Sequence, residues 1–378
     1  MPSFNSIHLR PPTRFALLSL TIFGTFALFL HSLGFFSSNI LANDTFVPQY
    51  HNVWNYTPPA TTHHPRTEYK ACFTTFVRND HTHLARLRLT MRNLEDSFNR
   101  RDRYPYIIFS DQDLSDEFKE LASAITRATV KFEKIPKELF GYPPYVDQKK
   151  AAKAREDMKD IIFGDSEDYR FLARFLAGTI YQHPALQEYD YYWRFETGTE
   201  YLCPMAYDPF KLMYDHNKKI SFSMALYEYE ETIPSLWNTT LDYIKKYPSS
   251  VQVNKPGGLW KFITNDDGDF NRCHFWSNFE IGSLQFFRGE DYQTFFKHID
   301  MSGGFFYERW GDPIIHTLAV VLFLDKNDIH HWEDIGYRVN QNFMHCPNDR
   351  ALWSKCPCRP EENFDWNGYS CLRFFLTA

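Results

Sequence analysis

The chain has 378 residues, which is enough for one large domain or two smaller ones. It is 43% hydrophobic and 18% aromatic, so it can bury a large core. The net charge of −6 gives no indication of nucleic-acid binding, and no internal repeat or low-complexity block stands out.

Residues 15–36 form an apolar segment without Asp, Glu, Lys or Arg. At about 1.5 Å per residue, this segment is long enough to span a bilayer core of about 30 Å. Arg10 and Arg14 precede it without a compensating acid, so the positive-inside rule predicts a cytosolic tail over residues 1–14 and a lumenal remainder. The alternative is a cleaved signal peptide, which the length of the run and the lack of a clear A-x-A site disfavour.

Residues 37–69 are polar, contain proline and histidine, and lack periodicity, which predicts a stem. Three N-glycosylation sequons follow the apolar segment, at Asn43, Asn55 and Asn238. Together with the anchor, they favour a protein of the secretory-pathway lumen. The lumenal domain is then expected over residues 70–378.

All seven cysteines lie after the predicted anchor, and four of them lie in the last 33 residues. This pattern predicts a loop-rich tail stapled by disulfides in an oxidising lumen. The Cys-x-Cys spacing of Cys356 and Cys358 also occurs in zinc sites, but no matching second pair exists. Because the count is odd, at least one thiol is left free or shared with another chain.

From residue 71 onwards, short apolar runs alternate with segments of helical periodicity. Strands are expected over residues 71–77, 104–111, 129–135, 189–196 and 219–226, and helices over residues 82–99, 115–126, 146–162, 168–181 and 207–217. Ser115 is the expected N-cap of its helix. This alternation predicts an α/β fold with a mainly parallel sheet flanked by crossover helices.

The strand expected over residues 189–196 ends in a charged pair, Arg194 and Glu196. In parallel sheets, ligands bind beyond the carboxyl ends of the strands, and Glu196 stands at that place. The sequence contains no G-x-G-x-x-G or Walker motif, so metal and side chains would have to hold a nucleotide here.

A second group of charged residues lies in "FFYERWGDPIIHT", where Glu308, Arg309, Asp312 and His316 fall within nine residues. Such a cluster at the start of an apolar helix is typical of a functional site. An ordinary salt-bridged helix start is the alternative interpretation.

Six segments of the sequence, in order and with similar spacing, resemble the motifs of the fungal α-1,2-mannosyltransferases of glycosyltransferase family fifteen. They are "YDYYWRFETG", "AYDPFKLM", "ETIPSLW", "CHFWSNFEIG", "GGFFYERWGD" and "NFDWNGYSC". The resemblance covers roughly residues 70–373. It implies a GT-A-like (Rossmann-like) fold, GDP-mannose as donor, Mn²⁺ as metal, a mannosylated glycoprotein as acceptor, and a type II protein of the Golgi membrane.

The resemblance also implies roles for particular residues. Glu196 corresponds to the family's metal-binding glutamate, and a carboxylate-bound divalent cation bridging a diphosphate is physically sensible. Arg194 assists nearby, and Arg78 contacts the nucleotide. Glu280 corresponds to the candidate nucleophile of this retaining family, with a glycosyl–enzyme ester and a same-face attack both left open.

Tyr169 is expected to contact the donor phosphate or sugar, with packing as the alternative, and Asp312 to bind the acceptor or accept its proton. The family's histidine metal ligand is replaced by Val339. Either His345 reaches the metal through a different loop path, or a water molecule replaces the ligand and the metal is bound more weakly. Leu176 and Ala177 also replace polar family residues. A diverged member with weak or lost catalysis, acting as a lumenal binding or scaffold protein, is therefore the alternative to an active enzyme.

Overall fold

The computed structural model describes residues 68–253, 255–340 and 342–378. The predicted anchor over residues 15–36 and the sequons at Asn43 and Asn55 lie outside these ranges, as does nearly all of the predicted stem. Within them, no helix combines the length and the apolar character needed to cross a membrane.

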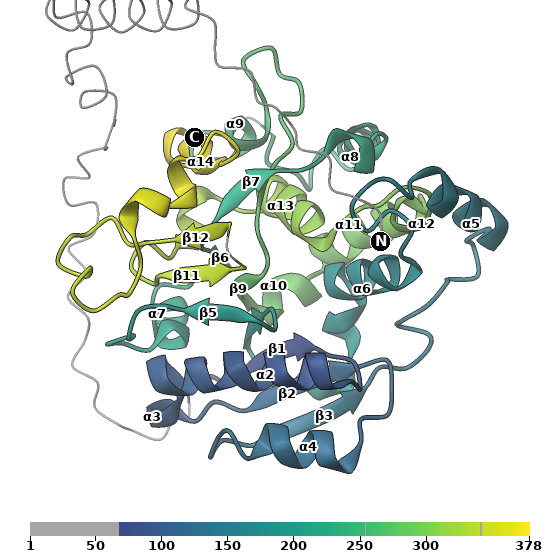
Figure 1. The fold of residues 1–378 in the computed structure, drawn as a ribbon. Helices are drawn as coiled ribbons and strands as arrows, with labels where there is room; N and C mark the ends of the chain where they lie inside the picture. Colours follow the sequence, from purple (N-terminus) through teal and green to yellow (C-terminus); the bar gives the residue numbers. More distant parts are fainter. Residues whose placement is uncertain (1–67, 254, 341) are drawn as a thin grey trace, which may run out of the picture. The chain divides into compact units, whose positions relative to one another are not determined.

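The main sheet of the described residues has seven strands in the order β10-β6-β9-β4-β1-β2-β3 (Figure 1). Strand β1 is parallel to β2 and β4, β2 is parallel to β3, and β6 is parallel to β10, whereas β9 is antiparallel to both of its neighbours. The prediction of a mixed, mainly parallel sheet is confirmed. Its strands are β1 (Ala71–Phe76), β2 (Tyr106–Ser110), β3 (Val130–Lys134), β4 (Tyr191–Phe195), β6 (Ile220–Phe222), β9 (Phe279–Ser283) and β10 (Ile329–His331).

Two smaller sheets accompany the main one. The first has the order β12-β11-β5, and the second pairs β7 with β8. Their strands are β5 (Thr199–Tyr201), β7 (Ala225–Tyr227), β8 (Cys273–Phe275), β11 (Tyr337–Val339) and β12 (Phe343–His345). The single strand predicted over residues 219–226 is therefore wrong, because it divides into β6 and β7 in different sheets. Its alternating pattern reports which side chains are buried, but not which strand pairs with each half.

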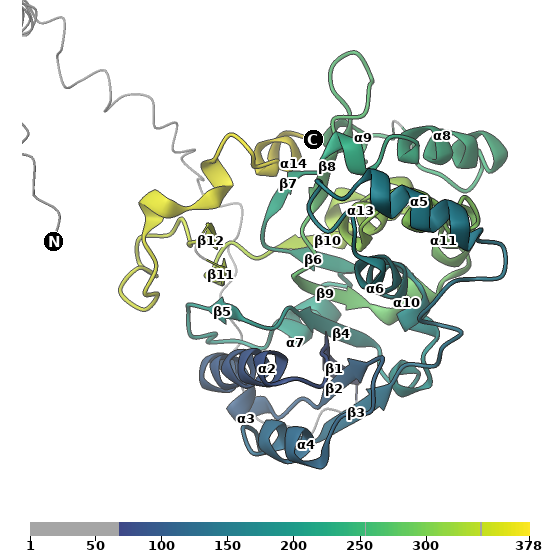
Figure 2. The same ribbon diagram turned by 45° about the vertical axis from the view of Figure 1, so that its right-hand side comes forward.

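Helices cover both faces of the main sheet (Figure 2). One face packs against Phe98 of η1 and Phe210 of α7, and the other against Phe175 of α6 and Phe287 of α10. The α-helices are α2 (His81–Leu94), α3 (Arg100–Asp102), α4 (Asp116–Ser123), α5 (Gln148–Asp157), α6 (Glu167–Ala177), α7 (Pro209–Asp215), α8 (Leu236–Lys246), α9 (Trp260–Ile263), α10 (Leu284–Arg288), α11 (Glu290–Met301), α12 (Gly304–Tyr307), α13 (Asp312–Phe323) and α14 (Leu372–Thr377). The short turns are the π-helical η1 (Glu95–Asn99) and the 3₁₀ segments η2 (Thr179–Gln182), η3 (Pro184–Leu186), η4 (Glu230–Thr232), η5 (Lys326–Asp328), η6 (Pro360–Glu362) and η7 (Phe364–Trp366).

The predicted N-cap is confirmed, since Ser115 Oγ accepts a hydrogen bond of 3.2 Å from the backbone N–H of Phe118. This bond satisfies one of the four N–H groups that a helix start leaves without a partner.

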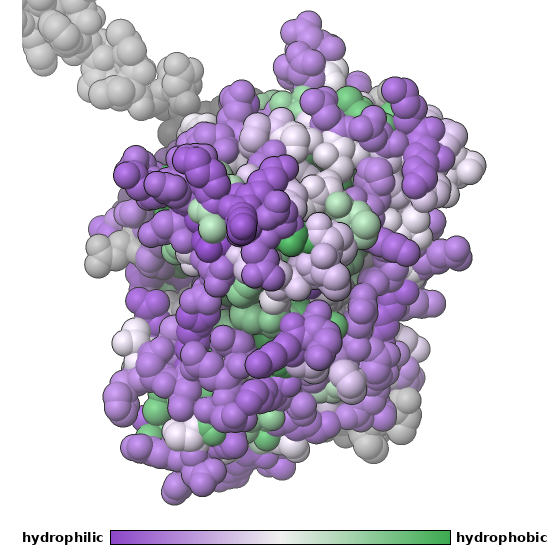
Figure 3. Space-filling view, turned by 90° about the vertical axis from the view of Figure 1, so that its right-hand side faces the viewer, coloured by the Kyte–Doolittle hydropathy of each residue, from purple (hydrophilic) through white to green (hydrophobic). Residues whose placement is uncertain are grey.

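The aromatic residues lie mainly inside, and hydrophilic side chains cover most of the face shown in Figure 3.

Strand β4 has two different faces. Trp193 stacks on Phe279 with ring centroids 5.0 Å apart and packs against Phe73 at 5.1 Å. Because successive side chains of a strand point to opposite faces, Tyr192 and Arg194 emerge on the other face. The aromatic packing of Trp193 thus fixes the register that presents Arg194 to α13.

Three disulfides join Cys203 to Cys356, Cys273 to Cys371, and Cys346 to Cys358. Cys72 is the remaining cysteine, a buried free thiol. The prediction of a disulfide-stapled tail with one unpaired thiol is confirmed. The zinc interpretation of the Cys-x-Cys pair is excluded, because both of its sulfurs are in disulfides.

Removing the Cys273–Cys371 disulfide with two serines should destabilise the domain more than removing the Cys346–Cys358 disulfide in the same way. The first closes a chain segment of 98 residues and the second one of 12, and the entropy lost by the unfolded chain grows with loop length. The expected difference is about 1–2 kcal/mol in the free energy of unfolding, measured by urea denaturation. Equal losses would show that the loop-entropy argument does not apply here.

Candidate active site

Four of the predicted site residues, Arg78, Arg194, Glu196 and Glu280, lie at the carboxyl edge of the parallel strands. Arg78 follows β1 and Glu196 follows β4 directly. Strand β9 runs the other way, so its first residues lie at this same edge, and Glu280 is the cross-strand partner of Arg194. Residues that are far apart in the sequence are therefore brought to one place, as the rule for parallel sheets predicts.

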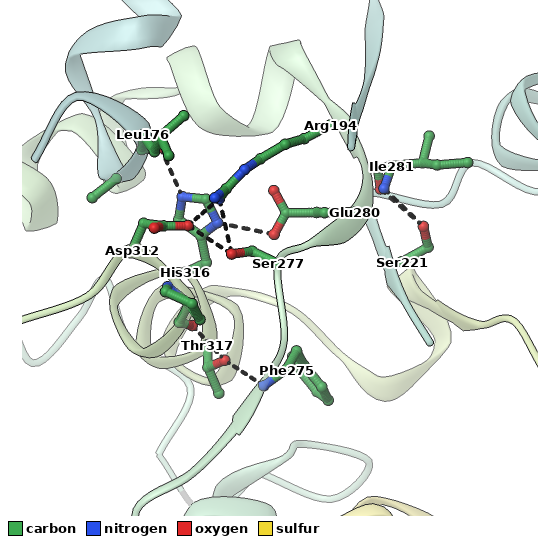
Figure 4. A network of polar contacts seen from close by, with 12 residues as sticks. Leu176, Arg194, Ser221, Phe275, Ser277, Glu280, Ile281, Asp312, His316 and Thr317 are labelled. Atoms are coloured by element: carbon green, nitrogen blue, oxygen red, sulfur yellow. Dashed lines mark hydrogen bonds and ion pairs between the residues drawn. The ribbon is translucent and has the colours of Figure 1, made fainter. Parts of the chain in front are cut away.

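Arg194 is the centre of a buried charge cluster (Figure 4). Its Nη1 forms an ion pair with Oδ2 of Asp312 and donates a hydrogen bond of 2.8 Å to Oγ of Ser277. Ser277 Oγ in turn donates to the same Asp312 oxygen at 2.6 Å. Asp312 is the first residue of α13, where the positive end of the helix dipole favours a carboxylate.

Burial by itself would lower the pKa of Arg194, but the carboxylates of Asp312, Glu196 and Glu280 outweigh it and raise the pKa above the ordinary arginine value. The guanidinium is therefore permanently charged. Three acidic side chains outnumber the two guanidinium groups that act on them, those of Arg194 and Arg86, so the cluster has an excess of negative charge whenever the acids are ionised. A divalent cation bound close by would balance that excess.

Glu280 lies deeper and is only 2% exposed. Its Oε1 accepts a hydrogen bond from the hydroxyl of Tyr192, and its Oε2 lies 2.9 Å from Nδ1 of His316. Nε2 of His316 lies 3.1 Å from the hydroxyl of Tyr181, which lies 3.0 Å from that of Tyr192. These four side chains form a closed ring of contacts.

Each oxygen of Glu280 therefore has a partner able to donate a hydrogen bond. These contacts fix the orientation of the carboxylate. Gly282 is needed for this arrangement, because a Cβ at that position would lie 2.7 Å from the ring of Tyr192. The backbone carbonyl of Leu176 lies 3.2 Å from His316 Nε2. Leu176 replaces a polar residue of the family, but its backbone carbonyl still contacts His316 in this network.

Glu196 differs from the other acids because it is exposed to solvent. Among the described residues, no hydrogen bond or ion pair engages its carboxylate. Loss of hydration raises its pKa above the ordinary glutamate value; Arg194 opposes this shift and Asp312 reinforces it. The turn that follows requires Gly198, whose φ of 92° lies in the left-handed region.

An unpaired carboxylate beside an excess of negative charge fits a hard divalent cation such as Mn²⁺. Such a cation would interact with Glu196 without having to break an existing salt bridge. The donor set of this part of the site is therefore compatible with the metal that the family resemblance implies.

Tyr169 lies on α6 beside the start of α13, since a Cβ at Gly311 would lie 3.2 Å from its hydroxyl oxygen. The buried Arg309 donates a hydrogen bond of 2.9 Å to that oxygen and one of 3.2 Å to Glu228. Burial raises the pKa of Tyr169, so its hydroxyl stays neutral. Because the oxygen accepts from Arg309, the hydroxyl hydrogen remains available to a further acceptor.

Arg78 is held by α6 rather than left free. Its Nη1 donates a hydrogen bond of 2.6 Å to Asp168, the residue before Tyr169, and this bond raises the pKa of Arg78. A second carboxylate, that of Asp111, lies 3.9 Å away. The pair is partly exposed, so it positions Arg78 at the carboxyl edge without burying it.

The structure does not bring His345 into one metal site with Glu196. His345 lies on β12, and β11 separates this strand from β5, which begins just after Glu196. Both of its ring nitrogens have partners, Asp365 at 2.7 Å and the carbonyl of Glu333 at 3.2 Å. Val339 lies on the strand next to β5 and pairs with Thr199, three residues after Glu196, so it is nearer to Glu196 in the sheet than His345 is.

Sequence reasoning assigned no role to Tyr192, Ser277 or His316. His316 was noticed as part of a charged cluster. Tyr192 stands two residues before Arg194, and Ser277 three before Glu280, but a strand pattern does not reveal a hydrogen bond between strands. The identity of their partners depends on the antiparallel pairing of β4 with β9.

Glu196→Gln should stabilise the protein at pH 7 in Mn²⁺-free buffer. A carboxyl whose pKa is raised by folding is destabilising in its ionised form, so its contribution improves only as pH falls through the raised pKa. The melting temperature of the variant should exceed that of the parent at pH 7, and the gap should shrink on acidification. Glu200→Gln is the control, because this exposed side chain has Arg338 at 2.7 Å. A lower melting temperature for Glu196→Gln would contradict the expectation.

The comparisons with known proteins agree with this geometry. The chain is 44% identical over 313 residues to glycolipid 2-alpha-mannosyltransferase 1 of Candida albicans, covering 82% of this chain and 71% of the relative. It is 42% identical to alpha-1,2 mannosyltransferase KTR1 of Saccharomyces cerevisiae, covering 81% and 78%. It is 38% identical to O-glycoside alpha-1,2-mannosyltransferase omh1 of Schizosaccharomyces pombe, covering 96% and 92%.

Two solved structures share the fold. Core-mannan synthase A of Aspergillus fumigatus in its Mn/GDP form has a TM-score of 0.76 and 34% identity, covering 85% of this chain and 87% of that one. The mannosyltransferase Ktr4p of Saccharomyces cerevisiae in complex with GDP has a TM-score of 0.77 and 30% identity, covering 82% of each. The family described as glycolipid 2-alpha-mannosyltransferase matches residues 38–378. The chain therefore belongs to this family, the fungal α-1,2-mannosyltransferases of glycosyltransferase family fifteen.

Proposed function

We propose that the protein is a retaining α-1,2-mannosyltransferase that moves mannose from GDP-mannose, with Mn²⁺ as cofactor, to a mannose-terminated O- or N-linked glycan of a glycoprotein. The observation that supports this most strongly is the charge cluster around Arg194. It places Glu196, Glu280 and Asp312 about one guanidinium at the carboxyl edge of the sheet. The names of relatives and of the Mn/GDP structure support the donor and the metal.

Glu196 would hold the metal, since its carboxylate is exposed and unpaired among the described residues. When bound, Mn²⁺ supplies positive charge for the diphosphate leaving group. Arg78 is placed to contact the nucleotide from the end of β1. The hydrogen that Tyr169 retains on its hydroxyl can be donated to a phosphate or sugar oxygen of the donor.

Glu280 would serve as the anion beneath the anomeric carbon, where positive charge develops in an oxocarbenium-like transition state. The donors on its two oxygens keep it oriented. Both a covalent ester and a same-face attack are compatible with this arrangement. Asp312, whose Oδ2 is engaged by Arg194 and Ser277, would hold Arg194 in place and contribute to acceptor binding or proton acceptance.

We further propose a type II protein of the Golgi membrane, anchored by residues 15–36, with residues 37–69 as stem and the catalytic domain in the lumen. Three disulfides support an oxidising compartment, because such bonds rarely persist in the cytosol. Asn238, the sequon within the domain, is exposed on α8, where a glycan could be attached.

A second candidate function, a lumenal binding or scaffold protein without catalysis, rests on Val339. Valine offers no ligand atom at the position that lies across from the turn after Glu196. Titration of GDP with and without Mn²⁺ separates the two functions. Binding that strengthens sharply with Mn²⁺ supports the enzyme, and no GDP binding under either condition supports the scaffold.

Glu280→Gln should lower mannose transfer from GDP-mannose to a mannoside acceptor by about 100-fold or more, because it removes a charge that acts on the transition state. Mn²⁺-dependent GDP binding, measured by isothermal titration, should stay within about twofold and shows that the variant is folded. Glu290→Gln, at an exposed position at the start of α11, is the matched control and should transfer normally. Unchanged turnover in Glu280→Gln would remove this residue from the mechanism.

Val339→His should reduce the Mn²⁺ concentration needed for half-maximal GDP binding, by roughly tenfold if the imidazole adds one ligand worth about 1.4 kcal/mol. The register with Thr199 places this side chain near the turn that follows Glu196. Val339→Leu, which adds no ligand atom, should leave the midpoint unchanged. An equal effect of both variants would show that packing, rather than metal ligation, causes the change.

A further inference from the structure

A cluster of potential metal ligands lies outside the site around Arg194. His331 comes from β10, His345 from β12 and Asp365 from η7, and one ligand atom of each lies within 4.8 Å of the others. All three side chains are buried, with exposures of 7%, 0% and 3%. The cluster therefore joins the last strand of the main sheet, a smaller sheet and the disulfide-bonded tail.

The two histidines are oriented in the same way. His331 Nε2 donates a hydrogen bond of 2.9 Å to the backbone carbonyl of Ser223, and His345 Nε2 donates one of 3.2 Å to that of Glu333. A carbonyl oxygen can only accept, so each Nε2 carries the hydrogen. In a neutral imidazole the lone pair is then on Nδ1, which is how metal-binding histidines are commonly held.

Two polar atoms of the cluster lack a hydrogen-bond partner within the described part of the chain. Nδ1 of His331 and Oδ1 of Asp365 are buried and have no hydrogen-bond partner among the described residues. Nδ1 of His345 lies 2.7 Å from Oδ2 of Asp365, a contact that requires a proton between them in the absence of a cation. A buried polar atom without a partner is destabilising, and a cation would satisfy several such atoms at once.

Glu333 lies beside this three-residue cluster and would have to move towards it to supply a fourth ligand. Its Oε1 lies 3.6 Å from Nδ1 of His331, and its side chain is 32% exposed, so it also gives the cluster a path to solvent. Two imidazoles and two carboxylates form a donor set suited to zinc, which prefers four ligands in a tetrahedron. Ligand atoms about 2.0–2.1 Å from zinc lie about 3.3 Å apart, so small movements would bring His331, His345 and Asp365 into place, and a movement of the part-exposed Glu333 side chain would supply the fourth ligand.

We propose that His331, His345, Asp365 and Glu333 bind one Zn²⁺ ion as a structural site, distinct from the Mn²⁺ site proposed at Glu196. Because protein atoms fill all four positions, the ion has no open position for a substrate. Its effect is to tie the tail that contains Asp365 to β10 and β12. This proposal does not depend on the proposed transferase activity.

The test uses the full chain purified in detergent without chelators. Elemental analysis should find roughly one zinc per chain, retained in the presence of excess Mn²⁺. Removal of zinc with dipicolinate should lower the melting temperature by several degrees, and Zn²⁺ but not Mg²⁺ should restore it. His331→Asn and Asp365→Asn should each lose most of the zinc.

Two controls keep the outcome interpretable. His298→Ala removes a histidine whose Nε2 also contacts a backbone carbonyl, that of Thr239, but which lies outside the cluster, and its zinc content should be unchanged. Glu196→Gln should retain zinc while losing Mn²⁺-dependent GDP binding, which separates the two metal sites. A folded parent protein that takes up no zinc, even from added Zn²⁺, would overturn the proposal. Zinc that persists in both cluster variants would overturn it as well.

Discussion

The buried guanidinium of Arg194 holds the elements of the candidate site together. A charge taken out of water costs several kcal/mol unless it is paired and hydrogen-bonded, and here Asp312 and Ser277 supply the partners. This requirement fixes how β4, β9 and the first turn of α13 meet. The aromatic packing of Trp193 on the opposite face holds β4 in the register that makes the pairing possible.

The acids around Arg194 divide into two kinds. Glu280 is buried, with Tyr192 and His316 on its oxygens, so its orientation is fixed before any ligand arrives. Glu196 is exposed and keeps its carboxylate free of protein partners in the described part of the chain. A reaction that separates charge between a sugar and a diphosphate needs both kinds of group. The buried Glu280 is held in a fixed orientation, and the exposed Glu196 is available to a ligand.

The tail contributes to the fold through covalent and polar links. The Cys203–Cys356 disulfide joins the tail to the segment just after β5, and the Cys273–Cys371 disulfide joins it to β8. The Cys346–Cys358 disulfide links two residues within the tail. The cluster of His331, His345 and Asp365 lies where this tail meets two sheets. A metal there would act in the same way as the disulfides, by holding a loop-rich segment that has little hydrophobic core of its own.

The strand that leads to Glu196, the Ser115 cap and the family are all predictable from the sequence, because these are local patterns or motifs in a fixed order. The antiparallel direction of β9, the contact of Glu280 with His316 and that of His345 with Asp365 are not. They follow from the folded structure, since they depend on which distant strands pair and in what register. A single sequence does not show which distant strands pair. The position of His345 is an example, because the strand order β12-β11-β5 places β11 between His345 and the strand that follows Glu196.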